Sequence, residues 1–162
     1  MGSIDEFNTL PREAAERKLY ECLANRRWAG EVASKRPFAD AASMIAAAWI
    51  GLNELTDDDW MAAFKAHPRI GERGGDAPGA SAREQSRAME ASTATLAALA
   101  TENRQYEERF GYVFLIRASG RSGDEIVSEL RRRMKNDPAT ELAEARRELS
   151  QIAQLRLEQL AR

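Results

Sequence analysis

The 162-residue sequence has few of the residues that build disulfide frameworks, metal clusters or redox centres. Its single cysteine, Cys22, excludes an internal disulfide framework and any cysteine-rich metal cluster. No apolar run approaches the roughly 20 residues of a membrane span. The N-terminus lacks the charged and apolar regions of a secretory signal. We therefore expect a cytoplasmic protein with no membrane partner and no metal site.

The charge of the chain is nearly balanced. Lys and Arg number 24 against 26 Asp and Glu, which gives a formal net charge of −2. The two signs are interspersed, as on a solvated helical surface. Because so small a net charge gives no general attraction to polyanions, we expect no nucleic-acid partner. A chain of this length is most simply one domain, large enough to bury a hydrophobic core without stabilising cross-links.

Apolar residues recur at three- and four-residue steps over most of the chain, which is typical of amphipathic helices. Residues that cap or open helices indicate where several of these segments begin: Asp40, Thr56, Ser122 and Asp137. The sequence contains no internal repeat and no convincing linker. It predicts an all-α fold, a single compact multi-helix domain over residues 1–162.

Ser81 and Glu84 form a capping-box pattern, which predicts the start of a long central helix. Its apolar stripe continues to residue 110, so a helix over residues 84–110 would span about 40 Å. Gly111 interrupts the pattern. Residues 112–116 form a short apolar run, and no second strand candidate exists to pair with it. We interpret this run as a buried, partly extended connection.

His67, the only histidine, is the candidate for proton transfer, because the unperturbed pKa of imidazole lies near neutrality. Pro68 disfavours helix at the preceding residue, so His67 should lie at or just past a helix end. A carboxylate, Glu84, and an amide, Gln85, follow nearby in the sequence. His67 could instead cap the carbonyl end of its helix. Ser81 and Glu84 could likewise form a capping box and nothing more.

Arg156 is the second unusual residue. The apolar stripe of the last helix runs through Leu142, Ala145, Leu149 and Ile152. Arg156 occupies the next position in phase, and no acidic residue lies three or four positions away. Because burying an unpaired guanidinium is costly, it should meet an anion, and a substrate carboxylate would suit its two-pronged geometry. Alternatively, the side chain could extend past its neighbours to water.

Short motifs occur in a fixed order along nearly the whole chain: Phe7-Asn8, Trp28-Ala29 to Arg36-Pro37-Phe38, His67-Pro68-Arg69-Ile70-Gly71, Ser81-x-x-Glu84-Gln85, Asn103-x-x-Tyr106-x-x-x-Phe110-Gly111-Tyr112-Val113-Phe114, Gly120-Arg121-Ser122 and Ile152-Ala153-x-Leu155-Arg156-Leu157. Each motif alone is weak, but the ordered set is specific. It resembles the 2-oxo-4-hydroxy-4-carboxy-5-ureidoimidazoline (OHCU) decarboxylase family of urate catabolism.

The resemblance implies an all-helical fold peculiar to that family, a homodimer, and conversion of OHCU to (S)-allantoin with neither a metal nor an organic cofactor. It implies that His67 is the catalytic acid, with Glu84 beside it. Further substrate-binding residues follow from the same resemblance. These are Pro68, Ser81 and Gln85 at the border of the substrate, the backbone of Phe114, Leu115, Ile116, Arg117 and Ala118, and the side chain of Arg156.

Two other functions stay open at the level of the sequence. The pair of His67 and Glu84 could transfer a proton in another cofactor-free enzyme, a ureide hydrolase or isomerase. The chain could also be a non-catalytic helical interaction module, whose apolar stripes form a core and a partner surface.

Overall fold

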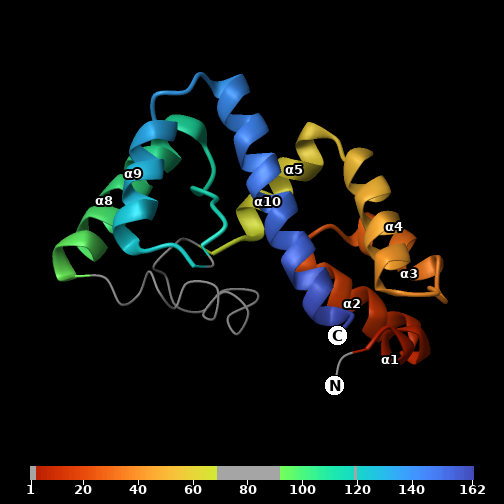
Figure 1. Cartoon of the computed structure of the whole chain (residues 1–162). Helices are drawn as coiled ribbons and strands as arrows, with labels where there is room; N and C mark the ends of the chain where they lie inside the picture. Colours follow the sequence, from red (N-terminus) through yellow and green to blue (C-terminus); the bar gives the residue numbers. More distant parts are fainter. Residues whose placement is uncertain (1–2, 69–91, 119) are drawn as a thin grey trace. The chain divides into compact units, whose positions relative to one another are not determined.

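The computed structural model describes residues 3–68, 92–118 and 120–162, and every regular element in these ranges is an α-helix (Figure 1). The predicted all-α fold is confirmed. No helix in this part of the chain is both long and apolar enough to cross a membrane. The helices are α1 (Ile4–Thr9), α2 (Arg12–Cys22), α3 (Arg26–Ser34), α4 (Ala41–Asn53), α5 (Asp57–Ala66), α8 (Thr93–Phe110), α9 (Gly123–Arg133) and α10 (Pro138–Leu160).

Local capping explains where four of these helices begin. A side-chain oxygen of the residue before the helix accepts a hydrogen bond from the backbone N–H three residues later, which satisfies one of the unpaired donors of the first turn. This contact confirms the starts predicted for α4, α5, α9 and α10, at Asp40, Thr56, Ser122 and Asp137.

Helix α8 begins later than the sequence suggested. Ser92 has extended backbone, and its hydroxyl accepts a hydrogen bond from the N–H three residues later, so Thr93 is the first helical residue. The prediction of one continuous helix over residues 84–110 is therefore wrong at Ser92. A short hydroxyl side chain bonds the neighbouring backbone and competes with the helix there. At the other end, Gly111 adopts φ +83° and ends α8 where the pattern predicted.

Backbone contacts divide the chain into two compact units, and the first comprises Met1–Ala63 and Ser150–Arg162. Within it, α3 packs against both α2 and α4. Trp28 is 1% exposed, and its indole N–H donates to the carbonyl oxygen of Ala48 at 3.0 Å. A Cβ on Gly51 would lie 2.7 Å from the Trp28 ring. Glycine at this position therefore allows α3 and α4 to approach closely.

Polar contacts tie the N-terminal helix to the segment after α3. The Asn8 amide exchanges two hydrogen bonds of 2.8 Å with the backbone of Phe38. The guanidinium of Arg36 donates to the carbonyl oxygens of Phe7 and Leu10 at 2.9 and 2.8 Å. Two of the ordered sequence motifs, Phe7-Asn8 and the one that ends in Arg36-Pro37-Phe38, therefore have a structural role within the first unit.

The second unit comprises Phe64–Leu149, and in it α8 and α9 lie side by side (Figure 1). Between these helices, residues 113–118 have no regular secondary structure. Their apolar side chains are nevertheless buried, with Phe114 and Leu115 each 1% exposed and Ile116 2% exposed. The predicted buried connection after Gly111 is confirmed.

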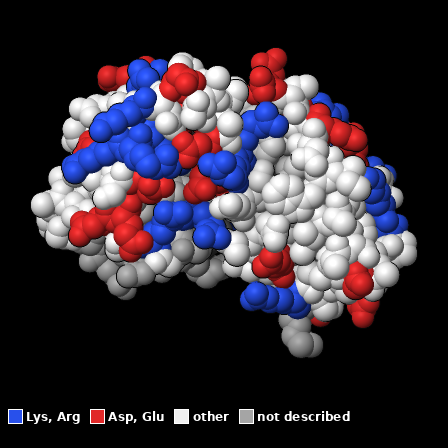
Figure 2. Space-filling model, turned by 45° about the horizontal axis from the view of Figure 1, so that its top comes forward, with Lys and Arg blue, Asp and Glu red and all other residues white. Residues whose placement is uncertain are grey.

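Acidic and basic side chains intermingle on the face of the molecule drawn in Figure 2. In the second unit, for example, the exposed Arg131 pairs with Glu102, and Arg132 pairs with Glu144, each at 2.8 Å. Exposed pairs of this kind contribute at most about 1 kcal/mol each. The balanced composition of the sequence therefore appears at the surface as mixed charge.

Candidate active site

His67 lies directly after the last residue of α5, as the following proline predicted. Its backbone N–H donates to the carbonyl oxygen of Phe64 at 3.1 Å, which closes the end of the helix. Its imidazole is half-buried, and Nδ1 lies 3.2 Å from the carbonyl oxygen of Pro68. That carbonyl accepts a hydrogen bond whenever Nδ1 carries a proton, and this contact orients the ring.

Aromatic packing joins the end of α5 to the non-helical segment of the second unit. Phe64, three residues before His67, is fully buried, and its ring centroid lies 4.9 Å from that of Tyr112. Such a pair contributes about 0.5–1.5 kcal/mol beyond the area that it buries. The helix end that bears His67 is thus fixed to the start of residues 112–118.

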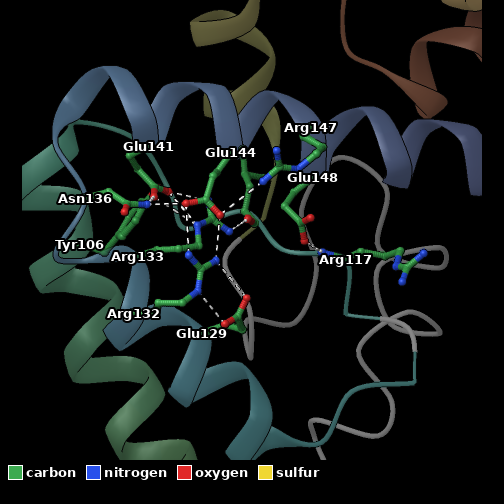
Figure 3. Close-up of polar contacts among 11 residues, drawn as sticks. Tyr106, Arg117, Glu129, Arg132, Arg133, Asn136, Glu141, Glu144, Arg147 and Glu148 are labelled. Atoms are coloured by element: carbon green, nitrogen blue, oxygen red, sulfur yellow. Dashed lines mark hydrogen bonds and ion pairs between the residues drawn. The ribbon is translucent and has the colours of Figure 1, made fainter.

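A buried ion pair also holds this segment (Figure 3). Arg133, the last residue of α9, is 1% exposed, and Glu141, in the first turn of α10, is 0% exposed. The Arg133 Nε donates to a Glu141 carboxylate oxygen at 2.9 Å. Its Nη1 donates to the carbonyl oxygen of Leu115. The Tyr106 hydroxyl, also buried, donates to the Glu141 carboxylate.

The pKa shifts in this cluster indicate that its side chains have a structural role and do not transfer protons. Burial raises the pKa of Tyr106 well above its usual range, and the hydrogen bond to the Glu141 carboxylate raises it further. Burial alone would lower the pKa of Arg133, but the hydrogen bonds and charge of Glu141 raise it overall. The phenol therefore stays a donor and the guanidinium stays a cation at neutral pH.

This cluster is not evident from the sequence patterns considered above. Arg133 ends the run Arg131-Arg132-Arg133, and a run of like charges usually indicates a solvated surface. A signal was nevertheless present, because Arg133 lies three residues after Leu130 and seven after Ile126, on the apolar face of α9. The same reasoning that singled out Arg156 would have found Arg133.

Arg156 lies on α10 in the first unit and is 8% exposed. The predicted core-facing position is confirmed, and this burial excludes the alternative in which the side chain extends to water. Its Nη1 donates to the carbonyl oxygen of Glu21 at 3.0 Å. This contact fixes one prong of the guanidinium against the end of α2.

The other predicted site residues are placed as follows. Pro68 is half-buried next to His67. In the segment predicted to contact substrate through its backbone, Phe114, Leu115, Ile116 and Ala118 are buried and Arg117 is partly exposed. All of these belong to the second unit, whereas Arg156 belongs to the first. Three further predicted residues, Ser81, Glu84 and Gln85, lie outside the described residues.

Comparisons with known proteins identify the family. The OHCU decarboxylase family model matches residues 8–158. The chain is 32% identical over 154 residues to the uric acid degradation bifunctional protein of Arabidopsis thaliana, covering 91% of this chain and 48% of that protein. It thus spans about half the length of this relative. It is 26% identical to the 2-oxo-4-hydroxy-4-carboxy-5-ureidoimidazoline decarboxylase of Haloferax volcanii, covering 96% of this chain and 94% of the relative.

A solved structure gives the same result. The chain aligns with a crystal structure of OHCU decarboxylase in the presence of (S)-allantoin at a TM-score of 0.80 and 32% identity, covering 90% of this chain and 97% of the other. The fold and these matches define a helical protein of the carboxy-lyase class. The chain belongs to the OHCU decarboxylase family.

Proposed function

We propose that this protein decarboxylates OHCU to (S)-allantoin in urate degradation, without a metal or an organic cofactor. The observation that carries the proposal is the family match over residues 8–158, which includes the only histidine of the chain. The position of His67 supports it further. The imidazole is half-buried at the end of α5, within the unit that also contains residues 112–118.

The chemistry explains why no cofactor is required. The carbon–carbon bond to the departing carboxylate breaks, and its electron pair is delocalised into the adjacent C=N bond of the imidazoline ring. The substrate thus contains its own electron sink, the task that pyridoxal or thiamine performs in other decarboxylases. The protein must then orient the carboxylate, stabilise the charged intermediate and deliver one proton to one face of the ring.

His67 delivers that proton in the proposed mechanism. The contact of Nδ1 with the Pro68 carbonyl oxygen supports this role, because it fixes the orientation of the ring. Glu84 polarises the imidazole, because a nearby carboxylate favours the protonated ring and keeps an acid available near neutral pH. Glu84 and Gln85 also hold the ureido and ring N–H groups, and Ser81 and Pro68 border the substrate.

Arg156 and the non-helical segment bind the rest of the substrate. The planar guanidinium grips the substrate carboxylate or the ring carbonyl, and the contact of Nη1 with Glu21 presets its orientation. The backbone of residues 114–118 contacts the substrate through its N–H and C=O groups. We propose one OHCU decarboxylase-like domain over residues 1–162, assembled as a homodimer.

Product analysis tests this function. OHCU is generated enzymatically, and its decay is followed in the presence of a chelator, with chiral detection of allantoin. Uncatalysed protonation occurs on both faces of a planar centre and gives a racemate. We expect faster decay and a single (S) enantiomer with the protein present. Formation of a racemate at the uncatalysed rate, or of a different product, would contradict the proposal.

A further inference from the structure

Residues 113–118 lack the regular hydrogen bonds that satisfy the backbone of a helix or a sheet. Phe114, Leu115 and Ile116 are nevertheless at most 2% exposed. Buried backbone N–H and C=O groups need partners, because leaving them unpaired costs about as much as a lost hydrogen bond. For two backbone groups of this segment, the partners are side chains of α9 and α10.

Two of these side chains hold the segment at two points (Figure 3). Arg133 donates to the carbonyl oxygen of Leu115, and its guanidinium lies 4.7 Å from the centroid of the Phe114 ring. Glu148 accepts a hydrogen bond from the backbone N–H of Arg117 at 3.0 Å. The first anchor is locked by a fully buried ion pair. The second consists of one hydrogen bond to a half-buried carboxylate.

Both anchors depend on one face of α10. Glu141, which binds Arg133, and Glu148 are seven residues apart, so they lie two turns apart on the same side of the helix. A helix with intact internal hydrogen bonds is stiff over this length. The two carboxylates therefore fix two points of the segment relative to each other.

Between the two anchored residues lies one residue whose backbone groups can meet a ligand. Leu115 and Arg117 are two residues apart, and side chains of α9 and α10 bind both. Ile116 lies between them, and no hydrogen bond within the described residues engages its N–H or C=O group.

We propose that Glu148 is a positioning residue of the enzyme. By holding the Arg117 N–H, it fixes the backbone of residues 114–118 in the conformation that meets the N–H and C=O groups of a ureide. This inference rests on the proposed function, in which that backbone contacts OHCU. A ureide presents donors and acceptors along one planar edge, so a shift of about 1 Å in the backbone misaligns several contacts at once and costs up to about 100-fold in rate. Glu148 itself touches neither the substrate nor the reacting atoms.

Three variants separate positioning from general stability. Glu148→Ala removes the acceptor, whereas Glu148→Gln keeps a carbonyl oxygen at the same place without the charge. Glu144→Ala is the matched control, because Glu144 lies one turn earlier on α10 and binds the side chains of Arg132 and Asn136 instead of the segment. We measure kcat and KM on enzymatically generated OHCU, the thermal midpoint, and amide hydrogen exchange at Arg117.

For Glu148→Ala we expect a loss of about 10- to 100-fold in kcat/KM, a thermal midpoint close to that of the wild type, and faster exchange of the Arg117 N–H. Glu148→Gln should restore kcat/KM to within about threefold. Glu144→Ala should lower the thermal midpoint and leave kcat/KM near wild type.

Wild-type kcat/KM in Glu148→Ala would overturn the inference. So would equal impairment of the Ala and Gln variants, or an equal loss of kcat/KM in Glu144→Ala. A wild-type protein that forms no (S)-allantoin would refute the proposed function, and the role of Glu148 in catalysis with it. Hydrogen exchange needs no turnover, so unchanged exchange of the Arg117 N–H in Glu148→Ala would refute the anchor separately.

Discussion

Replacing Arg133 by Met tests the buried ion pair of the second unit. The Arg133 side chain is 1% exposed and its partner Glu141 is 0% exposed, so the substitution leaves a carboxylate in the interior without its guanidinium. Removing one partner of a buried pair costs about 3–5 kcal/mol. The carbonyl oxygen of Leu115 also loses its donor. We therefore expect the free energy of unfolding to fall by about 4 kcal/mol or more.

Urea unfolding at pH 7, followed by circular dichroism, measures this change. Arg132→Met is the matched control, because the neighbouring side chain is 51% exposed and pairs with Glu129 and Glu144 at the surface. It should cost less than about 1 kcal/mol. Combining Arg133→Met with Glu141→Leu should cost less than the sum of the two single changes, because the second removes the stranded charge. A loss below 1 kcal/mol for Arg133→Met, or strict additivity in the double variant, would refute the reasoning.

Two further predictions concern the first unit. Gly51→Ala should destabilise the protein by about 1–3 kcal/mol in urea unfolding, because the new Cβ would lie 2.7 Å from the buried Trp28 ring. Gly30→Ala is its control and should be neutral or stabilising, because its Cβ would meet only a flexible carboxylate oxygen at 3.4 Å. The hydrogen bond from the Thr56 N–H, together with a neighbouring guanidinium, lowers the pKa of Asp59 to about 2, below its unfolded value near 4. The stabilisation that the Asp59 carboxylate gives the folded state is therefore full above about pH 4 and is lost as the pH falls toward 2. The difference in thermal midpoint between wild type and Asp59→Asn should therefore shrink from pH 5 to pH 2, and a constant difference would contradict this.

The sequence predicted helix starts better than helix continuity. Caps such as Asp40 and Ser122 are local, because the side chain binds a backbone N–H three residues away and needs nothing distant. The break before α8 was missed for a related reason. Ser92 fits the apolar stripe of a longer helix by position, and periodicity does not register a hydroxyl that caps instead of continuing.

The candidate site likewise has parts that local sequence patterns predict and parts that they do not. The proline that follows His67 predicts its position at a helix end. The spacing of apolar residues along the last helix predicts that Arg156 is buried. The anchors of residues 114–118 do not follow from local patterns. Arg133 and Glu148 reach backbone groups 18 and 31 residues away, and only the packing of α9 and α10 brings these groups together.

The most direct test of the central claim is the rate of (S)-allantoin formation from enzymatically generated OHCU, with His67→Ala compared with wild type. Lys65→Ala serves as the control, because Lys65 is exposed in the last turn of α5. A general acid contributes about 10²–10⁴ in rate, so His67→Ala should lose at least about 100-fold in kcat while Lys65→Ala keeps wild-type turnover. A folded His67→Ala protein that forms (S)-allantoin at the wild-type rate would contradict the account.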